Sequence, residues 1–416
     1  MVKRIDCCRA CGSKNLLPIL SLGPHYVSNF VDSGILGEKI PLDLVLCDPK
    51  QGGCSLLQLT CTAPAELMYH QYWYRSGMNK TMTAALADIA AKAQRLVSIG
   101  DGDIALDIGC NDGTLLRAYT DKRLFLAGFE PASNLLQYSE KGTGRIINDF
   151  FNGPSYRAAF GERKAKIVTS IAMFYDLEDP NQFVIDVREC LDKDGVWVIQ
   201  MSYLPLMLEQ NAFDNICHEH LEYYSLKSLE YVLNRNGMAV FDVELNDVNG
   251  GSIRTYIRNS GGRPTIPEGA AQRIEKMRTK ERGLKLDEKG PYEVFARRVE
   301  AIKSKVFDFI GNEVANGKKV FVYGASTKGN TLLQYFALDS KLIAAAAERN
   351  PEKWGKKTVG SLIPIISEEE ARAKKPDYFL ILPWHFLTEF TQREGPFLKA
   401  GGKFIVPLPE FKIISK

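Results

Sequence analysis

Twice in this chain an apolar, strand-like run ends in a glycine-containing turn that leads into a helical pattern. The first such opening spans residues 104–116 and the second spans residues 319–333, about 215 residues further on. A strand that turns through glycine into a helix is the usual start of a βαβ unit, in which helices join parallel strands. The sequence therefore predicts an α/β protein that contains two separate α/β folds.

Further strand-like runs, separated by helical stretches, follow each opening and indicate two mostly parallel sheets. Two later runs are expected to complete the first sheet. The predicted strands of the first sheet are Ile104–Asp107, Leu124–Glu130, Ile167–Ile171, Val196–Met201, Ala239–Glu244 and Ser252–Ile257. Those of the second sheet are Lys319–Tyr323, Leu342–Ala347, Tyr378–Leu382 and Lys403–Val406.

Chain length and turn residues divide the sequence into three parts. At 416 residues the chain exceeds one ordinary core of roughly 150 residues, and glycines and prolines cluster between Gly261 and Pro267. We expect an N-terminal module over residues 1–65, a central domain over 66–262 and a C-terminal domain over 263–416. The charged stretch from Gln272 to Val314, with its spaced apolar residues, predicts one or two amphipathic helices with a solvated face.

The first 61 residues hold six of the nine cysteines. In a reducing compartment such a cluster indicates metal binding rather than disulfides. Two pairs, Cys8 with Cys11 and Cys47 with Cys54, supply four thiolates, which suit a closed, tetrahedral zinc site. Cys7 and Cys61 are rivals for one position each. We therefore predict a small module held together by zinc.

Composition argues against several classes of partner. A net charge of +3 with 25% charged residues gives no general reason to expect nucleic acid. The first residues lack the apolar run of a signal peptide, and no segment reaches the ~18 apolar residues that span a bilayer. We therefore expect a cytoplasmic protein that acts on a small molecule and binds neither membrane nor nucleic acid.

The first glycine turn carries the residues expected to hold a nucleoside-containing cofactor. Asp107 ends the strand, and Gly109, Asn111 and Gly113 follow in the turn, where glycine lets the backbone approach a ligand. Glu130 ends the next predicted strand, where a carboxylate commonly binds ribose hydroxyls. The alternative is a turn with a purely structural role.

Two of the five histidines lie in one short segment, His218-Glu219-His220, which is followed by Tyr223 and Tyr224. Histidines two residues apart face opposite sides of a helix, so the pair is a poor zinc site. An imidazole beside a carboxylate suits acid–base catalysis, because it titrates near neutral pH. Catalysis, a hydrogen-bonded structural cluster and metal binding all remain open.

The second glycine turn, Tyr323–Thr331, leads into a helix whose first turn carries Lys328. Free N–H groups at a helix N-terminus, together with a lysine, can bind a diphosphate. The spacing of a phosphate-binding P-loop is missing. A diphosphate contact and an architectural turn are both compatible with this segment.

Taken together, these segments resemble the sugar C-methyltransferase family, which acts on nucleotide-linked keto-deoxysugars. The resemblance covers nearly the whole chain in the same order, which makes it more specific than any one motif. The matching segments are Cys8–Gly12, Asp107–Gly113, His218–His220 with Tyr223–Ser225, Gly250–Arg254, and Tyr323–Ala325 with Lys328–Thr331.

The resemblance implies a zinc module, a central Rossmann-like class I methyltransferase domain that binds S-adenosylmethionine, and a C-terminal Rossmann-like α/β domain. The substrate would lie between the last two. By the resemblance, the reaction removes a proton beside a ketone and transfers the cofactor methyl group to the resulting enolate carbon. His220 matches the base, with Glu219 beside it and Tyr223 as a donor to the enolate oxygen; the expected substrate-binding residues are His218, Tyr224, Lys328 and Asn330.

One position departs from the family pattern, because Cys217 stands where a tyrosine is often found. If that hydroxyl stabilises the enolate, this chain must use another donor, such as Tyr223 or Tyr224, or a different substrate. An O- or N-methyltransferase of the same architecture is therefore the main alternative, with His220 deprotonating a hydroxyl or an amine. A non-enzymatic zinc-module adaptor is a further alternative.

Overall fold

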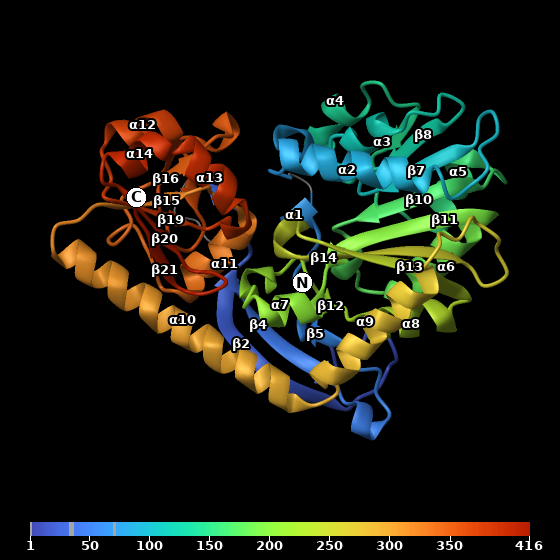
Figure 1. Ribbon diagram of the computed structural model, residues 1–416, viewed down its shortest axis with the longest axis horizontal. Helices are drawn as coiled ribbons and strands as arrows, with labels where there is room; N and C mark the ends of the chain where they lie inside the picture. The colour runs from blue at the N-terminus through green and yellow to red at the C-terminus, as the bar shows by residue number, and fades with distance from the viewer. Residues whose placement is uncertain (1, 33–36, 70–71) are drawn as a thin grey trace.

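The structure, a computed structural model, describes residues 2–32, 37–69 and 72–416, and three large sheets organise them (Figure 1). The N-terminal sheet is antiparallel and has the strand order β12-β5-β4-β2. Along β4 every second residue is buried, from Ile40 to Leu46, as expected for a strand with one face on a core. Its strands are β2 (Leu16–Tyr26), β4 (Lys39–Cys47), β5 (Leu57–Leu59) and β12 (Glu222–Tyr223).

Two small pairings connect the N-terminal part to itself and to the C-terminal part. In the first, β1 (Lys3–Arg4) pairs with β6 (Cys61–Thr62). In the second, β3 (Phe30–Val31) pairs with β17 (Lys357–Thr358). The N-terminal module therefore contacts the last part of the chain through backbone hydrogen bonds.

The central sheet has seven strands in the order β13-β14-β11-β10-β7-β8-β9, and the middle strands are parallel. Parallel strands place their carboxyl ends along one edge, which is where ligands bind in such sheets. The strands are β7 (Ile104–Ile108), β8 (Phe125–Phe129), β9 (Arg145–Ile147), β10 (Ala165–Ile171), β11 (Leu191–Ser202), β13 (Met238–Asn246) and β14 (Ser252–Asn259).

Successive residues of a strand point to opposite faces of the sheet. In the central sheet both faces are covered by helices. Ala105 packs with α2 and α3, whereas Leu106 packs with the helices of the other face. The first face carries α2 (Lys80–Ala93) and α3 (Thr114–Ala118). The second carries α5 (Gly153–Phe160), α6 (Pro180–Cys190), α8 (Leu226–Arg235) and α9 (Ala270–Leu284).

The helix α9 packs on the central sheet, although it follows the expected boundary at residues 262/263. Its buried residues Ile274 and Met277 belong to the core of that sheet, and the helix contacts β13. The division at 262/263 stays a prediction from the glycine and proline cluster. The packing favours a division between α9 and α10 (Lys289–Ala315), which are the two amphipathic helices predicted for this stretch.

The C-terminal sheet has the order β18-β16-β15-β19-β20-β21, with parallel strands apart from the last. Its third strand in space, β15, leads through Gly324 into α11 (Thr327–Tyr335). The expected strand at Leu342–Ala347 begins only at Ala346, because the backbone carbonyl and the carboxylate of Asp339 hold the residues before it in a turn. The strands are β15 (Val320–Tyr323), β16 (Ala346–Glu348), β18 (Ile365–Ser367), β19 (Tyr378–Ile381), β20 (Lys403–Val406) and β21 (Lys412–Ile414).

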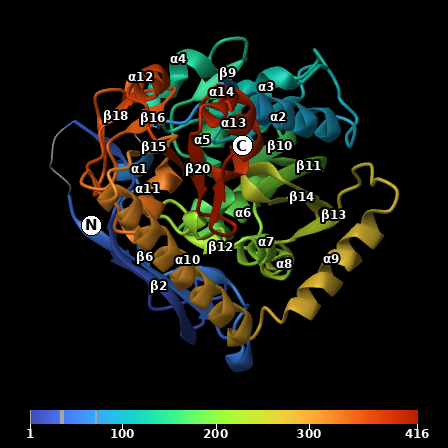
Figure 2. The same ribbon diagram turned by 60° about the vertical axis from the view of Figure 1, so that its left-hand side comes forward.

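The long helix α10 joins the first and last parts of the chain, because it contacts β2 and shares a core with the C-terminal sheet (Figure 2). The helices not yet described are α1 (Glu66–Tyr69), α4 (Leu136–Ser139), α7 (Leu204–Glu209), α12 (Glu368–Ala373), α13 (Leu387–Arg393) and α14 (Gly395–Lys399). Within the described ranges, none of the helices combines the length and apolar character that crossing a bilayer requires.

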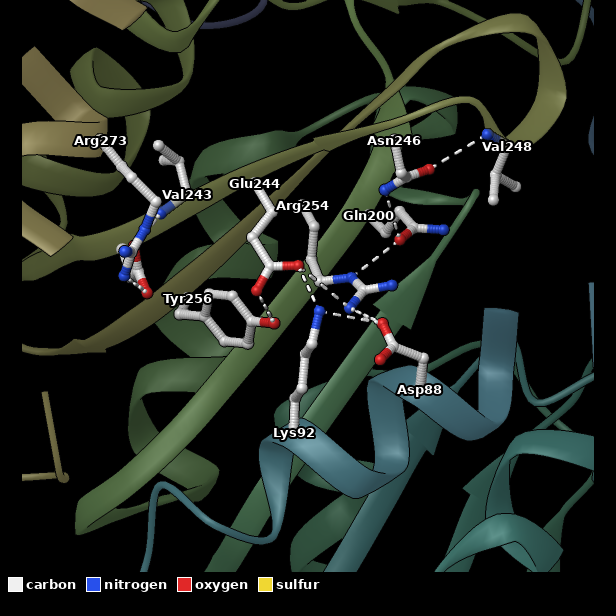
Figure 3. A network of polar contacts seen from close by, with 11 residues as sticks. Asp88, Lys92, Gln200, Val243, Glu244, Asn246, Val248, Arg254, Tyr256 and Arg273 are labelled. Atoms are coloured by element: carbon white, nitrogen blue, oxygen red, sulfur yellow. Dashed lines mark hydrogen bonds and ion pairs between the residues drawn. The ribbon is translucent and has the colours of Figure 1, made fainter. Parts of the chain in front are cut away.

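A buried arginine ties α2 to the antiparallel edge of the central sheet (Figure 3). Arg254 on β14 is 2% exposed, and its guanidinium contacts Asp88 on α2 at 2.7 Å and Glu244 on β13 at 3.5 Å. Its Nε also donates to Oε1 of Gln200 at the end of β11, at 2.9 Å. The arginine thus fixes the orientation of Gln200 at the edge where the strands end.

Candidate active site

The four predicted zinc ligands come together in the N-terminal module. The Sγ atoms of Cys8, Cys11, Cys47 and Cys54 all lie within 4.8 Å of one another. Two of the contacts are 3.6 Å, between Cys8 and Cys54, and 3.4 Å, between Cys11 and Cys47. Thiolates placed about 2.3 Å from one zinc ion in a tetrahedron are separated by similar distances, so the donor set fits the metal.

The two rival cysteines lie elsewhere. Neither Cys7 nor Cys61 belongs to the group of four, and the Cys61 thiol instead accepts a hydrogen bond from the Thr60 hydroxyl at 3.7 Å. A second layer supports the cluster, because the side-chain amide of Gln58 donates to Cys8 Sγ at 3.1 Å. A Cβ on Gly53 would come within 2.6 Å of Cys47 Sγ, so only glycine fits there. The structure thus groups the four cysteines that were predicted as zinc ligands, and their role as ligands stays a prediction.

The zinc module holds the histidine-containing segment directly. Strand β12, which begins two residues after His220, pairs with β5 of the module. Next to this pairing, the backbone N–H of Leu59 donates to the carbonyl of Leu221 at 2.8 Å. The ring of His218 contacts the carbonyl oxygen of Ile40 on β4 through Nε2, at 3.0 Å. The position of the segment therefore depends on the module.

A cavity of about 260 Å³ lies at the carboxyl ends of β7, β8, β10 and β11. Asp107, Gly109, Asn111 and Glu130, which the sequence predicted to bind the cofactor, all line it. Aromatic and apolar side chains complete the wall, among them Phe129, Tyr72, Tyr74, Met82 and Leu86. The cavity also has four carboxyl groups, those of Asp107, Glu130, Asp149 and Asp176, and together with the apolar wall they fit a ligand that carries positive charge, hydroxyl groups and an aromatic base.

Two of the carboxyl groups in this cavity, those of Asp107 and Glu130, have pKa values far from the usual range. Burial raises the pKa of Asp107 to about 7, although its hydrogen bond from the Thr169 hydroxyl opposes the shift. Burial also raises the pKa of Glu130 to about 7. Each Glu130 oxygen already accepts a backbone N–H, from Asn111 at 2.7 Å and from Ala132 at 2.9 Å. Glu130 therefore shapes the turn as well as facing the cavity.

The residues of the glycine turn have different roles. Gly109 lines the cavity with a φ of +73°, a conformation that glycine adopts without strain. The side chain of Asn111 connects the turn to residues 74–76, because it donates to the Tyr74 carbonyl and accepts from the Ser76 N–H. Gly113 lies behind the cavity, where a Cβ would come within 3.0 Å of the Ser139 carbonyl oxygen. The geometry therefore favours a packing role for Gly113.

A second cavity, of about 320 Å³, lies between the central and C-terminal parts. Glu219, His220 and Lys328 line it, together with residues of the second glycine turn. The two cavities share several lining residues, including Tyr72, Asp176 and Lys328. A group held in the first cavity can therefore reach a molecule held in the second.

The ring of His220 has one defined proton arrangement. Its Nδ1 lies 2.9 Å from the carbonyl oxygen of Asn215. A carbonyl can only accept a hydrogen bond, so Nδ1 carries the proton and Nε2 is left as the basic nitrogen. Burial, followed by the positive charge of Lys328, lowers the pKa of His220 well below its usual value. The imidazole is therefore neutral at physiological pH and able to accept a proton.

Three buried carboxyl groups face the same cavity. Burial raises the pKa of Asp176, Asp214 and Glu219, and the charge of Lys328 opposes each shift. One oxygen of each carboxyl group is buried without a protein partner among the described residues. Polar atoms that are buried in this way are expected to meet a ligand or water.

Four further residues predicted for the site lie outside the lining of both cavities. The Tyr223 hydroxyl donates to the Asn215 carbonyl, the Tyr224 hydroxyl to Glu222, and the Asn330 amide to the Asn29 carbonyl. His218 points toward β4. The structure thus places His220, Glu219 and Lys328 in one cavity. The other four residues contact protein groups instead, which favours supporting roles for them.

Several residues of the site were missed in the sequence. Asp176 lies in η4 (Phe174–Asp176), directly after β10, and Asp214 lies in η5 (Phe213–Asn215). His385 comes from η8 (Trp384–Phe386) in the C-terminal part. The tyrosines at positions 69, 72 and 74 also line the first cavity and were not predicted. For the two aspartates, the only signal was that each lies close to the end of an element.

Comparisons with known proteins place the whole chain among methyltransferases. Family models match residues 8–69 as a zinc binding domain, 74–243 as a methyltransferase domain and 247–409 as a C-methyltransferase C-terminal domain. The C-methyltransferase NovU of Streptomyces niveus is 30% identical over 422 residues, covering 100% of this chain and 98% of that protein.

Solved structures with a similar fold cover part of the chain. Magnesium protoporphyrin IX methyltransferase from Synechocystis, with bound SAH, has a TM-score of 0.34 at 12% identity, covering 44% of this chain and 88% of that one. An S-adenosylmethionine-dependent methyltransferase from Clostridium acetobutylicum has a TM-score of 0.32 at 13% identity, covering 43% and 91%.

Proposed function

Because this chain belongs to the C-methyltransferase family, we propose that it transfers the methyl group of S-adenosylmethionine to a carbon atom of a nucleotide-linked 4-keto-deoxysugar. When bound, S-adenosylmethionine supplies a methyl group that is reactive because it is attached to a sulfonium. A carbon atom becomes a nucleophile only after it loses a proton beside a carbonyl. The protein must therefore supply a base.

The observation that carries the proposal is the arrangement of His220. Its Nδ1–H is held by the Asn215 carbonyl, so its basic Nε2 is the nitrogen that remains for a substrate. The ring lines the second cavity and packs on Tyr175, with ring centroids 4.2 Å apart. Tyr175 also lines the cofactor cavity, so base and cofactor lie close to the same wall. This arrangement supports a mechanism in which proton removal is followed by methyl transfer.

We assign residues of this chain to the steps of the reaction. Nε2 of His220 takes the proton from the substrate carbon, and the C–H electron pair becomes the enolate. As the new carbon–carbon bond forms, the carbon–sulfur bond of the donor breaks and the carbonyl is restored. Carboxyl groups at Asp176 and Glu219 are available to bind sugar hydroxyls, because each has a buried oxygen without a protein partner.

The outer part of the second cavity suits the nucleotide. Arg75, Arg349, Lys353 and Arg393 line it together with three glutamates that pair with Lys353, Arg393 and Arg349, and the pair at Arg349 is the longest, which makes Arg349 the best candidate for a diphosphate contact. The Arg349 side chain is 54% exposed, and its ion pair with Glu389 is long, at 3.8 Å. Its guanidinium is therefore accessible to a ligand. We therefore orient the substrate with its sugar at His220 and its diphosphate toward Arg349.

Proton exchange in deuterium oxide tests the proposal at its first step. Without a methyl donor, the enzyme is expected to replace the proton beside the ketone of a nucleotide-linked 4-keto-deoxysugar with deuterium, as followed by NMR. Several such sugars, linked to uridine diphosphate or thymidine diphosphate, form the test panel. If the enzyme binds members of the panel but catalyses no exchange in any, enolate formation is excluded and the proposal is wrong.

A further inference from the structure

An enolate needs a hydrogen-bond donor or a cation at its oxygen as well as a base at its carbon. The two groups must each lie about 3 Å from neighbouring atoms of one substrate, so both must face the same small region of the cavity. His220 supplies the base under the proposed function, on which this inference rests. The second group must be a donor or a cation that faces the same region of the cavity as His220.

The tyrosines expected to be this donor are already engaged. The Tyr223 hydroxyl donates to the Asn215 carbonyl at 3.3 Å, and the Tyr224 hydroxyl donates to a Glu222 oxygen at 2.7 Å. Neither lines either cavity. Cys217 does line the second cavity, but a thiol is a weak donor. The donor must therefore come from another residue.

Lys328 is a cation that meets the geometric condition. It lies in the first turn of α11 and lines both cavities, so it is located where the methyl group and the substrate carbon meet. Its Nζ contacts Oδ1 of Asn215 at 2.6 Å. An ammonium has three N–H donors, so two remain for a ligand after this contact.

Asn215 connects Lys328 to the base. Its backbone carbonyl accepts from Nδ1 of His220, and its side-chain oxygen accepts from Nζ of Lys328. Asn215 is itself fixed, because it is 3% exposed and its side-chain amide donates to the Ala212 carbonyl at 3.0 Å. One immobile residue of the central part thus sets the positions of both groups, although Lys328 belongs to the C-terminal part.

We propose that Lys328 stabilises the enolate oxygen of the substrate and that Asn215 is the positioning residue that aligns it with His220. Lys328 donates a hydrogen bond and keeps its proton, while the proton removed from carbon goes to Nε2 of His220. The cations at Arg349 and Arg393 line only the second cavity, so they are placed for a diphosphate and Lys328 is placed for the reacting end.

The test compares Lys328→Met with Arg349→Met, which removes a cation from the same cavity without touching Asn215. For the panel member that the wild-type enzyme exchanges, Lys328→Met is expected to slow deuterium exchange at saturation by about 10²–10³-fold, the loss typical of one oxyanion donor. The Kd of this variant for the substrate should change less than about 3-fold. The reason is that the lost interaction is made mainly with the enolate and not with the ketone that binds first. Arg349→Met should instead act mainly on binding and raise the Kd by a larger factor than it slows saturated exchange.

A pH profile gives a second readout that a structural defect would not produce. Removing the charge of Lys328 should raise the pKa of His220, so the acidic limb of the exchange profile should move to higher pH. Lys328→Arg should keep the limb in place and restore part of the rate. The titratable and charged groups that line the cavity with His220 are Tyr72, Tyr74, Arg75, Tyr175, Asp176, Asp214, Cys217, Glu219, Tyr323, Lys328, Glu348, Arg349, Lys353, Glu368, His385, Glu389 and Arg393. All of them except Lys328 stay unchanged in the comparison.

The outcomes separate this inference from the proposed function. One result would overturn the inference: the Lys328→Met variant exchanges at the wild-type rate at saturation, its Kd for the substrate is raised, and the acidic limb of its pH profile does not move. Lys328 would then be assigned to the diphosphate. If the wild-type enzyme itself exchanges no member of the panel, the proposed function fails and this inference fails with it. Cofactor binding by calorimetry, retained in Lys328→Met, shows that the variant is folded.

Discussion

The proton on Nδ1 of His220 is the residue-level detail on which the chemistry depends. The contact with the Asn215 carbonyl fixes that proton and leaves Nε2 free to act as a base. His218, only two residues away, has its ring nitrogen against a backbone carbonyl of β4 instead. The two histidines thus have different environments, and only the environment of His220 suits the base that we propose.

Replacing His220 with asparagine should lower turnover by about 10²–10⁴-fold, because the titrating nitrogen is lost while a polar side chain remains. Binding of cofactor and substrate should survive, as measured by calorimetry. His218→Asn is the matched control and should show a smaller loss, because its ring lies outside both cavities. Equal losses in the two variants would contradict the assignment of the base.

The pH dependence of turnover follows from the direction of the His220 pKa. Its neutral form is the active one, and burial together with Lys328 lowers its pKa in the folded protein. The base should therefore already be unprotonated at about pH 6.5, the ordinary imidazole value. The rate governed by this group should be flat above that pH and fall only in more acidic solution, as steady-state rates across pH will report. A rise centred at or above the ordinary imidazole value would argue against it.

Cofactor binding should release protons near neutral pH. In the empty cavity the pKa values of Asp107 and Glu130 are raised to about 7, mainly by burial. A positively charged ligand with ribose hydroxyls favours their ionised forms, so binding should lower both pKa values and strengthen between about pH 6 and 8. Calorimetry in buffers of different ionisation enthalpy measures the released protons, and proton uptake would contradict the expectation.

The Glu130→Gln variant separates the two carboxyl groups. It should release fewer protons than the wild type and bind the cofactor about 1–3 kcal/mol more weakly, because a charge-assisted hydrogen bond is lost. Unchanged affinity together with unchanged proton release would remove Glu130 from the cofactor site.

At the residue scale, the sequence predicted what a local pattern can encode. The four zinc ligands and the placement of Asp107, Gly109 and Glu130 in one cavity follow from spacing and strand ends. Asp176 and Asp214 were missed, because an isolated aspartate after a strand or in a short 3-10 helix has no distinctive neighbours. Tyr223 was expected in the cavity, yet the direction of its hydroxyl depends on β12 pairing with β5, which sequence spacing does not specify.

At the scale of elements, the pairing of β12 with β5 couples the zinc module to the active site. The segment between Cys217 and Tyr224 is held on one side by β5 and by the contact of His218 with Ile40. The four-cysteine cluster joins the segment 8–11 to the segment 47–54, which connects β4 to β5. Loss of zinc should therefore displace His220 more than it disturbs the cofactor cavity.

Zinc removal tests this coupling. The purified protein should hold about one zinc per chain, and Cys11→Ser should lose it, whereas Cys7→Ser should keep it. Hydrogen exchange in the zinc-free protein should increase at residues 217–224 and much less at β7 and β8, while cofactor affinity is largely kept. If residues 217–224 stay as protected as in the zinc-bound protein, the module does not position the base.

The network around Arg254 should contribute measurably to stability. Arg254→Met leaves Asp88, Glu244 and Gln200 without their shared partner, and the free energy of unfolding should fall by about 1–3 kcal/mol. The loss is expected below that of a fully buried pair, because Asp88 and Glu244 have side chains 48% and 29% exposed. Lys92→Met is the control and should cost at most about 1 kcal/mol, since its ion pairs are exposed.

Urea denaturation followed by circular dichroism measures both variants. An Arg254→Met protein as stable as the wild type would mean that solvent at Asp88 and Glu244 already offsets the interaction.

The elements themselves were largely predictable, since long apolar runs between turns determine strands. Two features differ from the expectation, one for a local reason and one for a tertiary reason. The strand expected at Leu342 starts later because Asp339 stabilises a turn. The helix α9 was assigned to the C-terminal part, but its Ile274 and Met277 are buried in the central core, a tertiary contact that glycines and prolines before it cannot reveal.

At the scale of the whole molecule, two α/β folds and a zinc module meet around one pair of connected cavities. The central sheet supplies the residues that we propose to hold the cofactor, the zinc module holds the strand beside His220, and α11 of the C-terminal part supplies Lys328. None of the three parts contains the complete set.

The product of the reaction tests the central claim most directly. The enzyme is incubated with the panel of nucleotide-linked 4-keto-deoxysugars and S-adenosylmethionine whose methyl carbon is labelled with carbon-13, and the product is examined by NMR. We predict that the labelled methyl group is bonded to the carbon beside the ketone, with loss of that carbon's proton. A labelled methyl group bonded to oxygen or nitrogen would contradict the claim and establish the alternative kind of transfer.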